Sequence, residues 1–277
     1  GALARRRYGT GDRIVLGRRL AAVAAEMLET LEASDEPRSV PAEGQGSFAE
    51  AMRAVARRID LDIEVSLDAR LVAGAATGDR VVFLAPRRFG VVEARRLVAH
   101  EVLGHAVASA NARGQPLLLF SAGTAGSFGD QEGVAIALER EAGALDSARA
   151  RTLAARVVAS DMVHRGASFT ETARHLVHDR HFSVESAVAL AERAHRGGGV
   201  ARDTAYLEGW LRVDAALARG QTSLDELRTG RVSLAALGAL RELRSVGLAR
   251  PPMFVPVTSE ALPSPETPLA LAAEAAT

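Results

Sequence analysis

The sequence of 277 residues contains no cysteine and no lysine. Without cysteine the chain can form neither disulfide bonds nor thiolate metal sites. Its 34 basic residues are all arginine, and they balance 34 acidic residues, so that the formal net charge is zero. A neutral chain has no overall field that would attract nucleic acid or an anionic membrane. We therefore expect neither among its partners.

Aromatic residues and long hydrophobic runs are also scarce. Aromatic side chains make up 4% of the chain, although hydrophobic residues as a group reach 48%. This hydrophobic share is ample for a core in a chain of this length. No apolar run reaches the roughly 20 residues that a membrane-spanning helix needs. A cytoplasmic bacterial enzyme is the simplest expectation.

Two short polar motifs interrupt this apolar background, namely His100-Glu101-Val102-Leu103-Gly104-His105 and Gln131-Glu132-Gly133. A catalytic zinc ion usually takes three ligands from histidine and carboxylate side chains and leaves a fourth position for water. A glutamate beside the first histidine could deprotonate that water, because the metal lowers its pKa. The first motif therefore predicts His100 and His105 as ligands of one Zn²⁺ and Glu101 as the base of a peptidase.

The spacing of the two histidines is unusual, because they stand five positions apart rather than the four of the common zinc motif. In a regular α-helix a five-residue step rotates by about 140°, so the rings would point to different sides. A single π-type turn would absorb the additional residue and return the rings to one side. Gly104 falls inside this turn, where the missing side chain would let another backbone approach closely.

The third ligand is expected in the next helical segment, at Glu132, because a carboxylate in a largely apolar run needs a cation as its partner. Asp130 and Glu139 are the alternatives. Asp130 is interpreted as a helix N-cap, and Glu139 as a group that orients a ligand from behind. The competing interpretation is an amphipathic helix with ordinary histidines and a surface glutamate. The apolar residues around the motif favour the interpretation as a metal site, because burying three polar groups among them is costly unless a ligand such as a metal ion compensates the cost.

The chain resembles the QEGLA-motif family, whose animal members are the microtubule-associated tyrosine carboxypeptidases. The similarity runs from about residue 71 to residue 257 and includes, besides the two motifs above, the segments 71–76, 111–117, 196–199 and 203–209. The resemblance implies a zincin-like, more narrowly gluzincin-like, peptidase. It also implies His100, His105 and Glu132 as the ligands of one zinc ion, with Glu101 as the catalytic base.

The resemblance further implies that a C-terminal carboxylate must be bound, and three residues are predicted to act on the substrate. An arginine can bind a carboxylate through two parallel hydrogen bonds, so Arg196 and Arg202 are predicted to bind it. Tyr206 is predicted to donate to the oxyanion of the reaction. Arg202 replaces a lysine that the family commonly has, which changes how a carboxylate would be bound. The alternatives are that Arg196 caps the preceding helix and that Tyr206 packs in the core.

We therefore expect a zinc-dependent carboxypeptidase that removes the C-terminal residue of a peptide or protein. The resemblance suggests that this residue is tyrosine or phenylalanine. One alternative is an endopeptidase or aminopeptidase with the same metal. Another is a metal-binding regulatory protein without catalytic activity. The presence of Glu101 favours an enzyme, because a structural zinc needs no base and usually has a fourth protein ligand.

The residue patterns predict an α+β fold, a mostly helical zincin-like domain with a small sheet ahead of the HExxxH helix. Strands are expected over 61–67 and 80–85. The second is interpreted as an edge strand that binds the substrate backbone by β-addition, with an ordinary buried strand as the alternative. Helices are expected at residues 18–32, 48–58, 91–111, 130–142, 147–165, 169–179, 183–195, 203–219 and 234–246.

The domain organisation expected from composition has three parts. Residues 1–47 form an N-terminal helical extension and linker, residues 48–258 the catalytic domain, and residues 259–277 a flexible tail rich in proline and alanine. Within the catalytic domain His175, His178 and His181 recur at a spacing of three. They predict either a second metal site or, as we favour, a solvated stripe near a helix C-terminus.

Overall fold

A computed structural model of the chain describes residues 10–32, 39–196 and 202–262, which form a mostly helical α+β fold. The described residues divide into two compact units. The first comes from the stretches 1–35 and 146–214, and the second from 36–145 and 215–277. Among the described residues, no helix has the length and apolar character required to cross a bilayer.

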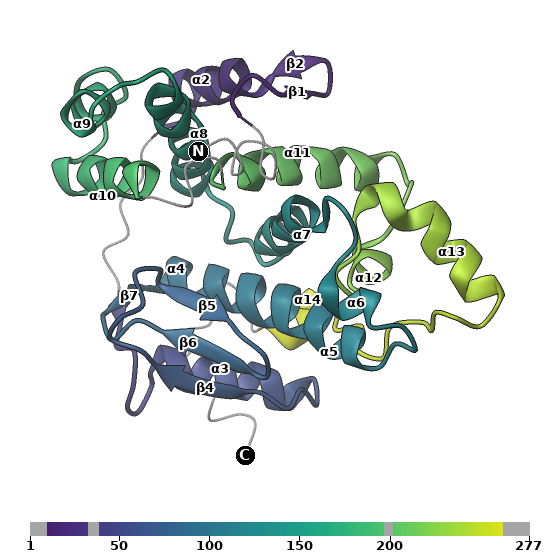
Figure 1. Cartoon of the computed structure of the whole chain (residues 1–277). Helices are drawn as coiled ribbons and strands as arrows, with labels where there is room; N and C mark the ends of the chain where they lie inside the picture. Colours follow the sequence, from purple (N-terminus) through teal and green to yellow (C-terminus); the bar gives the residue numbers. More distant parts are fainter. Residues whose placement is uncertain (1–9, 33–38, 197–201, 263–277) are drawn as a thin grey trace. The chain divides into compact units, whose positions relative to one another are not determined.

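The first unit is built around α8, which packs against three other helices (Figure 1). Each of α8, α9 and α10 begins after an N-cap residue whose side chain accepts a hydrogen bond from a backbone N–H of the first turn. At α9 this is a full capping box between Ser168 and Glu171. The elements of this unit are β1 (Ile14–Val15), β2 (Arg18–Arg19), α2 (Leu20–Thr30), α8 (Ser147–His164), α9 (Phe169–His178), α10 (Val184–His195) and most of α11 (Thr204–Ala218).

The second unit is built around one long helical segment, which consists of α4 (Val91–Leu97), the π-helix η1 (Val98–Ala106) and α5 (Val107–Arg113). α7 (Ser127–Glu141) packs against η1, and so do α3 (Phe48–Arg58) and a small sheet (Figure 1). Every residue of η1 except His105 is buried. The polar motif therefore lies inside the core of this unit.

The small sheet has three strands in the order β4 (Glu64–Leu67), β6 (Val81–Leu84) and β5 (Ala75–Thr77). β4 runs parallel to β6, whereas β5 runs antiparallel to it. The strand expected at 80–85 is thus the central strand, and its interpretation as an edge strand is wrong. Its alternative, an ordinary buried strand, agrees with the structure. β5 forms an edge instead, and its three residues were too few to give a strand pattern.

The start of α7 also differs from the expectation. α7 begins at Ser127 after Gly126, whose φ of 80° is one that glycine adopts readily. Asp130 therefore lies one turn inside the helix, and its interpretation as the N-cap is wrong. Its buried carboxylate accepts a hydrogen bond from the backbone N–H of Leu234, with Oδ2 and N 2.8 Å apart.

Short elements complete the second unit. β3 (Ser39–Val40) lies in the expected linker and pairs with β7 (Phe89–Gly90). The tail expected from residue 259 overlaps a short helix, α14, where Ala261 is buried, and residues 263–277 lie outside the described residues. The other elements are α6 (Leu119–Ala122), α12 (Leu224–Leu227), η2 (Leu234–Ala236), α13 (Leu237–Ser245) and α14 (Thr258–Ala261).

Buried amide side chains attach the later part of this unit to its central helices. Gln131 donates from Nε2 to the carbonyl oxygens of Leu227 and Val232, at 3.1 and 2.9 Å. Asn111 donates from Nδ2 to the carbonyl oxygen of Arg228 at 2.9 Å. The glutamine that precedes Glu132 in the second motif therefore has a structural role, because it satisfies two carbonyl groups that would otherwise be buried without partners.

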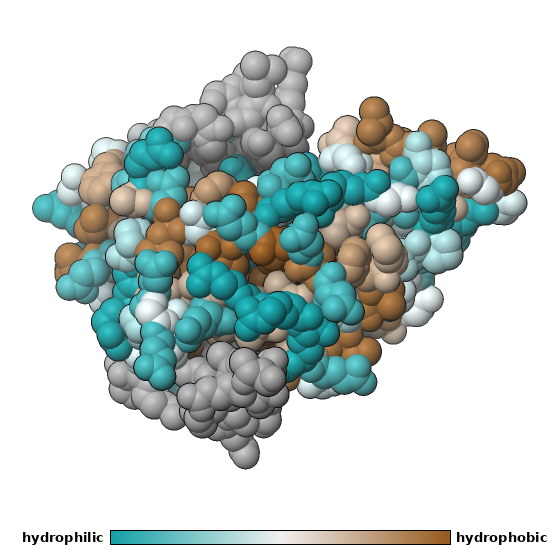
Figure 2. All heavy atoms as spheres, turned by 90° about the horizontal axis from the view of Figure 1, so that it is seen from below, coloured by the Kyte–Doolittle hydropathy of each residue, from teal (hydrophilic) through white to brown (hydrophobic). Residues whose placement is uncertain are grey.

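Polar and hydrophobic residues are interspersed over the face shown in Figure 2, and hydrophobic residues are frequent on its right-hand side. Five residues between 246 and 257 are large, hydrophobic and at least 46% exposed: Val246, Leu248, Met253, Val255 and Val257. Scattered exposed hydrophobic residues are common on folded proteins. They carry no functional conclusion here.

Replacing Gly104 with alanine tests the packing of η1 on α7. A Cβ atom at this position would lie 3.1 Å from Ala135 Cβ and 3.3 Å from Ala135 Cα. We expect Gly104→Ala to lower the free energy of unfolding by about 1–3 kcal/mol, because the two helices must move apart. Urea titration followed by circular dichroism measures this.

The matched control is Gly238→Ala in α13, where a Cβ atom would meet nothing within 4 Å. This variant should be as stable as the parent or slightly more stable, since alanine is the better helix former. Equal effects of the two substitutions would contradict the packing argument.

Candidate metal centre

The π-helix brings the two histidines of the first motif to one side. The Nε2 atoms of His100 and His105 lie 3.2 Å apart, and the rings meet edge to face with their centroids 4.8 Å apart. This arrangement agrees with the π-type turn expected from the five-residue spacing. A regular α-helix would have directed the rings to different sides.

Two side chains from elsewhere in the unit contact backbone carbonyl groups of η1. The hydroxyl of Thr77, on β5, lies 3.1 Å from the carbonyl oxygen of Glu101. The buried guanidinium of Arg228 donates from Nη1 to the carbonyl oxygen of Leu103 at 3.2 Å. A π-type segment disturbs the regular helical ladder of hydrogen bonds, so a donor such as Arg228 helps to satisfy its carbonyl groups.

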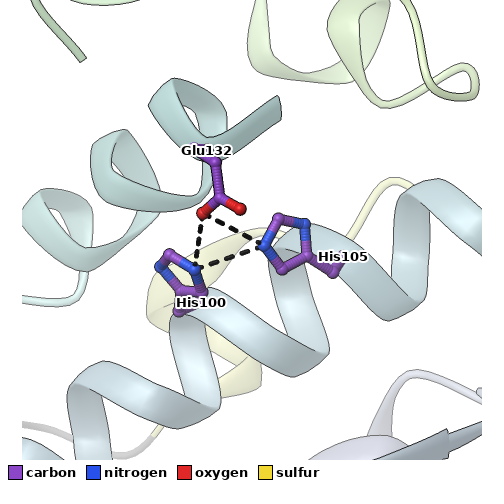
Figure 3. Close-up of side chains that lie close together, drawn as sticks. All are labelled: His100, His105 and Glu132. Atoms are coloured by element: carbon purple, nitrogen blue, oxygen red, sulfur yellow. Dashed lines mark hydrogen bonds and ion pairs between the residues drawn. The ribbon is translucent and has the colours of Figure 1, made fainter. Parts of the chain in front are cut away.

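α7 provides the third member of the group, Glu132 (Figure 3). Its Oε2 atom lies 3.2 Å from Nε2 of His100 and 3.6 Å from Nε2 of His105. The close approach requires a glycine at position 104, which faces Ala135 on α7. The ligand atoms of His100, His105 and Glu132 all lie within 4.8 Å of one another.

These distances fit a metal ion. Four ligands at about 2.0–2.1 Å in tetrahedral geometry lie about 3.3 Å from one another, close to the separations of the three ligand atoms. Oε2 of Glu132 is buried and faces both imidazoles without a hydrogen bond of good geometry. The group of His100, His105 and Glu132 could therefore bind one metal ion.

Glu139 lies behind this group and contacts the far side of His100. Its Oε1 atom is 2.8 Å from Nδ1 of His100, and the residue is fully buried. A carboxylate on Nδ1 keeps the proton on that nitrogen and leaves Nε2 available as a ligand. The contact agrees with the interpretation of Glu139 as a group that orients a ligand.

Glu101, beside His100, is also buried and is oriented by β5. Its Oε2 atom accepts a hydrogen bond from the hydroxyl of Thr77 at 2.7 Å. The sequence analysis missed this role of Thr77. The signal in the sequence that could have indicated this role is that Thr77 directly follows residues 71–76, one of the segments that resemble the family.

The electrostatics of the group follow from burial and from its carboxylates. Burial alone would lower the pKa of His100, but its contacts with Glu132 and Glu139 outweigh burial and raise this pKa to about 10. Burial would raise the pKa of Glu132, but its contacts with His100 and His105 lower it far below the usual range. Without a metal, the group is thus an imidazolium held between carboxylates.

The other residues predicted to act on the substrate belong to the first unit. Tyr206 is half-buried in α11, where its side chain contacts two arginines. Arg202 is exposed in the turn before α11. Arg196 is the C-cap residue of α10, with its Nε 4.0 Å from Glu192 Oε1, which agrees with the alternative that it caps this helix. The substrate-binding and catalytic roles of these three residues stay predictions.

The other histidine group shows no metal geometry within the described part of the chain. Nδ1 of His175 lies 2.7 Å from Oδ2 of Asp179, and His178 and His181 are exposed. The search for three convergent ligands in this part of the chain finds His100, His105 and Glu132. This agrees with a solvated stripe near the end of α9.

The fold and the site together define a mostly helical α+β protein with a buried group of two histidines and one glutamate that could bind a metal ion. The family described as microtubule-associated tyrosine carboxypeptidase matches residues 2–276. The chain belongs to this family, which confirms the resemblance found in the sequence. The family's description indicates a carboxypeptidase-like peptidase. Comparison with curated proteins found no match.

The stability of the protein after metal removal should depend on pH through His100. Because the pKa of His100 is raised to about 10, its stabilising effect is complete below its ordinary pKa of 6.5 and is lost as the pH rises towards 10. We expect the free energy of unfolding of chelator-treated protein to fall over this range. The measurement is urea unfolding at a series of pH values.

The His100→Gln variant is the control for this pH dependence. Groups away from His100 titrate equally in both proteins, so the difference between the two curves reports on His100 and on Glu132, whose pKa depends on the contact with His100. Parallel curves between pH 6.5 and 10 would contradict the raised pKa of His100.

Proposed function

We propose that the protein is a zinc-dependent carboxypeptidase with a zincin-like centre, in which His100, His105 and Glu132 bind one Zn²⁺. The observation that carries this proposal is the convergence of the three ligand atoms inside the core of the second unit. A bound zinc ion would polarise the scissile carbonyl group and lower the pKa of water. Two imidazoles and one carboxylate are ligands that catalytic zinc sites use, and three protein ligands leave the fourth coordination position of the ion open for water or substrate.

Glu101 is the base in this proposal. Its carboxylate takes the proton of the attacking water and gives it to the leaving amine as the peptide bond breaks. The hydrogen bond from Thr77 to Oε2 supports this role, because it holds the carboxylate in one orientation beside the metal ligand His100. A protein that only binds the metal would need no buried, oriented carboxylate next to its ligands.

The family's description favours removal of a C-terminal residue over the endopeptidase and aminopeptidase alternatives. The proposed substrate is the C-terminus of a peptide or protein, with an aromatic last residue as the first one to test. Arg202 and Arg196 are proposed to bind its carboxylate, and Tyr206 to donate to the oxyanion. β5 is proposed to bind the substrate backbone, since it is an edge strand and contacts η1.

Replacing the base tests the proposed reaction. We expect the parent to shorten peptides by one C-terminal residue and Glu101→Gln to be about 10²–10⁴-fold slower, because glutamine cannot accept the proton. Mass spectrometry of a set of peptides that differ in their last residue measures the rate and the preference. Elemental analysis should find zinc in both proteins.

The matched control is Glu64→Gln, which makes the same change at an exposed position on β4. It should cleave at the rate of the parent. Cleavage within the peptides or from their N-termini would contradict carboxypeptidase action, and undiminished activity of Glu101→Gln would contradict the role of Glu101.

A second prediction concerns Glu139. Glu139→Gln should weaken zinc binding by about 10–100-fold, because the amide orients His100 less strongly and lowers its basicity. Competition with a chromophoric chelator measures the affinity. Glu64→Gln, the same change at an exposed position, again serves as the control. An unchanged zinc affinity of Glu139→Gln would show that the 2.8 Å contact between Glu139 and His100 does not strengthen zinc binding.

A further inference from the structure

The side chain of Thr77 joins the small sheet to Glu101. Its Oγ1 atom lies 2.7 Å from Oε2 of Glu101 and 3.1 Å from the carbonyl oxygen of the same residue. A hydroxyl group has one proton to donate, and the carboxylate oxygen is the closer and stronger acceptor. Among the described residues, Oε1 of Glu101 makes no hydrogen bond or ion pair. Thr77 therefore holds one oxygen of the carboxylate and leaves the other to take a proton from water.

The hydrogen bonds of the hairpin β5–β6 show which main-chain groups of β5 are used within the sheet. In an antiparallel pair, opposite residues alternate between pairs that exchange backbone hydrogen bonds and pairs that exchange none. The backbone N–H of Gly78 donates to the carbonyl oxygen of Val81 at 2.7 Å, and that of Ala85 donates to Gly74 at 3.0 Å. Ala76 stands two positions from each glycine. The alternation therefore directs the main chain of Ala76 towards β6 as well.

Ala75 and Thr77 have the opposite orientation, so their backbone N–H and C=O groups point away from β6. β5 ends the sheet on this side. Within the described ranges, no backbone or side-chain group bonds to the main chain of these two residues from that side. Ala75 is buried and Thr77 is partly exposed, and unpaired main-chain groups in such places are costly until a partner binds. An extended peptide is a partner that pairs with all four groups.

Thr77 thus belongs to both features, because its hydroxyl holds the carboxylate of Glu101 and its main chain forms part of the free edge. A displacement of β5 moves the hydroxyl together with the main chain. β5 has three residues and pairs with a strand on one side. Short elements with few hydrogen bonds are among those that open most readily. A peptide that pairs with β5 adds hydrogen bonds and restrains it.

We propose that Thr77 makes the rate of cleavage depend on the length of the substrate, because a peptide paired with β5 fixes Thr77 and thereby the carboxylate of Glu101. Thr77 is a positioning residue, since it acts on the reaction through Glu101. Binding energy from residues remote from the scissile bond is then used to orient the base, which raises the rate of the chemical step as well as the affinity. This inference rests on the proposed function, in which Glu101 is the base and β5 binds the substrate backbone.

The inference also names a class of substrate. The main-chain groups of Ala75 and Thr77 lie two residues apart along β5, which is about 7 Å in an extended strand. A dipeptide is too short to pair with both residues and to present its peptide bond to Glu101 at the same time. The preferred substrates are therefore extended peptides with several residues ahead of the scissile bond.

The experiment compares N-acetylated alanine peptides of two to six residues that share their last two residues. Single-turnover measurements with excess zinc-loaded protein give the rate of cleavage, and its dependence on protein concentration gives the affinity. For the parent, the rate should rise about tenfold or more from two to five residues, which is the contribution of one hydrogen bond to a charged group.

The matched control substrate is the five-residue peptide with N-methyl groups on two successive residues ahead of the scissile bond. Successive residues of a strand point their N–H groups to opposite sides, so one of the two methyl groups faces β5 and prevents pairing. This peptide should be cleaved about as slowly as the shortest peptide. Cleavage as fast as that of the unmodified peptide would overturn the inference, because length would then act without the edge of β5.

Thr77→Val keeps the shape of the side chain and removes its hydroxyl. Its cleavage rate should not rise with peptide length, whereas its affinity should still increase with length because the main chain of β5 is unchanged. Thr77→Ser retains the hydroxyl and should restore the rise. Thr170→Val, the same change at an exposed position of α9, should behave like the parent. Zinc affinity, measured by competition with a chelator, should be equal in all four proteins.

The outcomes separate a failure of this inference from a failure of the proposed function. A parent rate that is independent of length, or a rise that persists in Thr77→Val, would overturn the inference alone. Weaker zinc binding by Thr77→Val would also overturn it, because Thr77 would then support the whole metal site. No cleavage of any peptide by the parent, or undiminished cleavage by Glu101→Gln, would overturn the proposed function and the inference with it.

Discussion

The approach of α7 to the π-helix η1 is the contact on which the candidate metal centre depends. It carries the carboxylate of Glu132 to two imidazoles, and it is possible because Gly104 presents no side chain to Ala135. Burial of a carboxylate is costly unless a positive charge compensates it. The same contact therefore brings the ligand atoms together and buries the negative charge of Glu132, which a proton on His100 or a metal ion must balance.

The groups around this contact come from distant parts of the chain and have distinct tasks. Thr77 on β5 contacts the side chain and the backbone carbonyl of Glu101, while Arg228 donates to the carbonyl group of Leu103. Glu139 contacts the far nitrogen of His100. Each contact satisfies a buried polar group, so it stabilises the fold and orients the site at once. This double role explains why a wide, irregular helix can lie in the core.

The metal centre illustrates the cost of burying several charges of one sign. The group in the second unit places Glu101, Glu132 and Glu139 near two imidazoles and could bind a cation. A buried surplus of one sign is costly, and a ligand of the other sign removes that cost.

The sequence by itself determined the features that depend on residue type and local spacing. The five-residue step between His100 and His105 predicts the π-type turn. Residue patterns predict helices such as α8 and α9, and the second motif indicates Glu132 as the third member of the group. Only the tertiary structure decided that β6 is a central strand and that Asp130 binds Leu234 instead of capping α7. It also decided the contact of Thr77 with Glu101. The reason is that helical hydrogen bonds and caps join residues close in sequence, whereas strand order and buried polar contacts join residues far apart, and local patterns do not identify those partners.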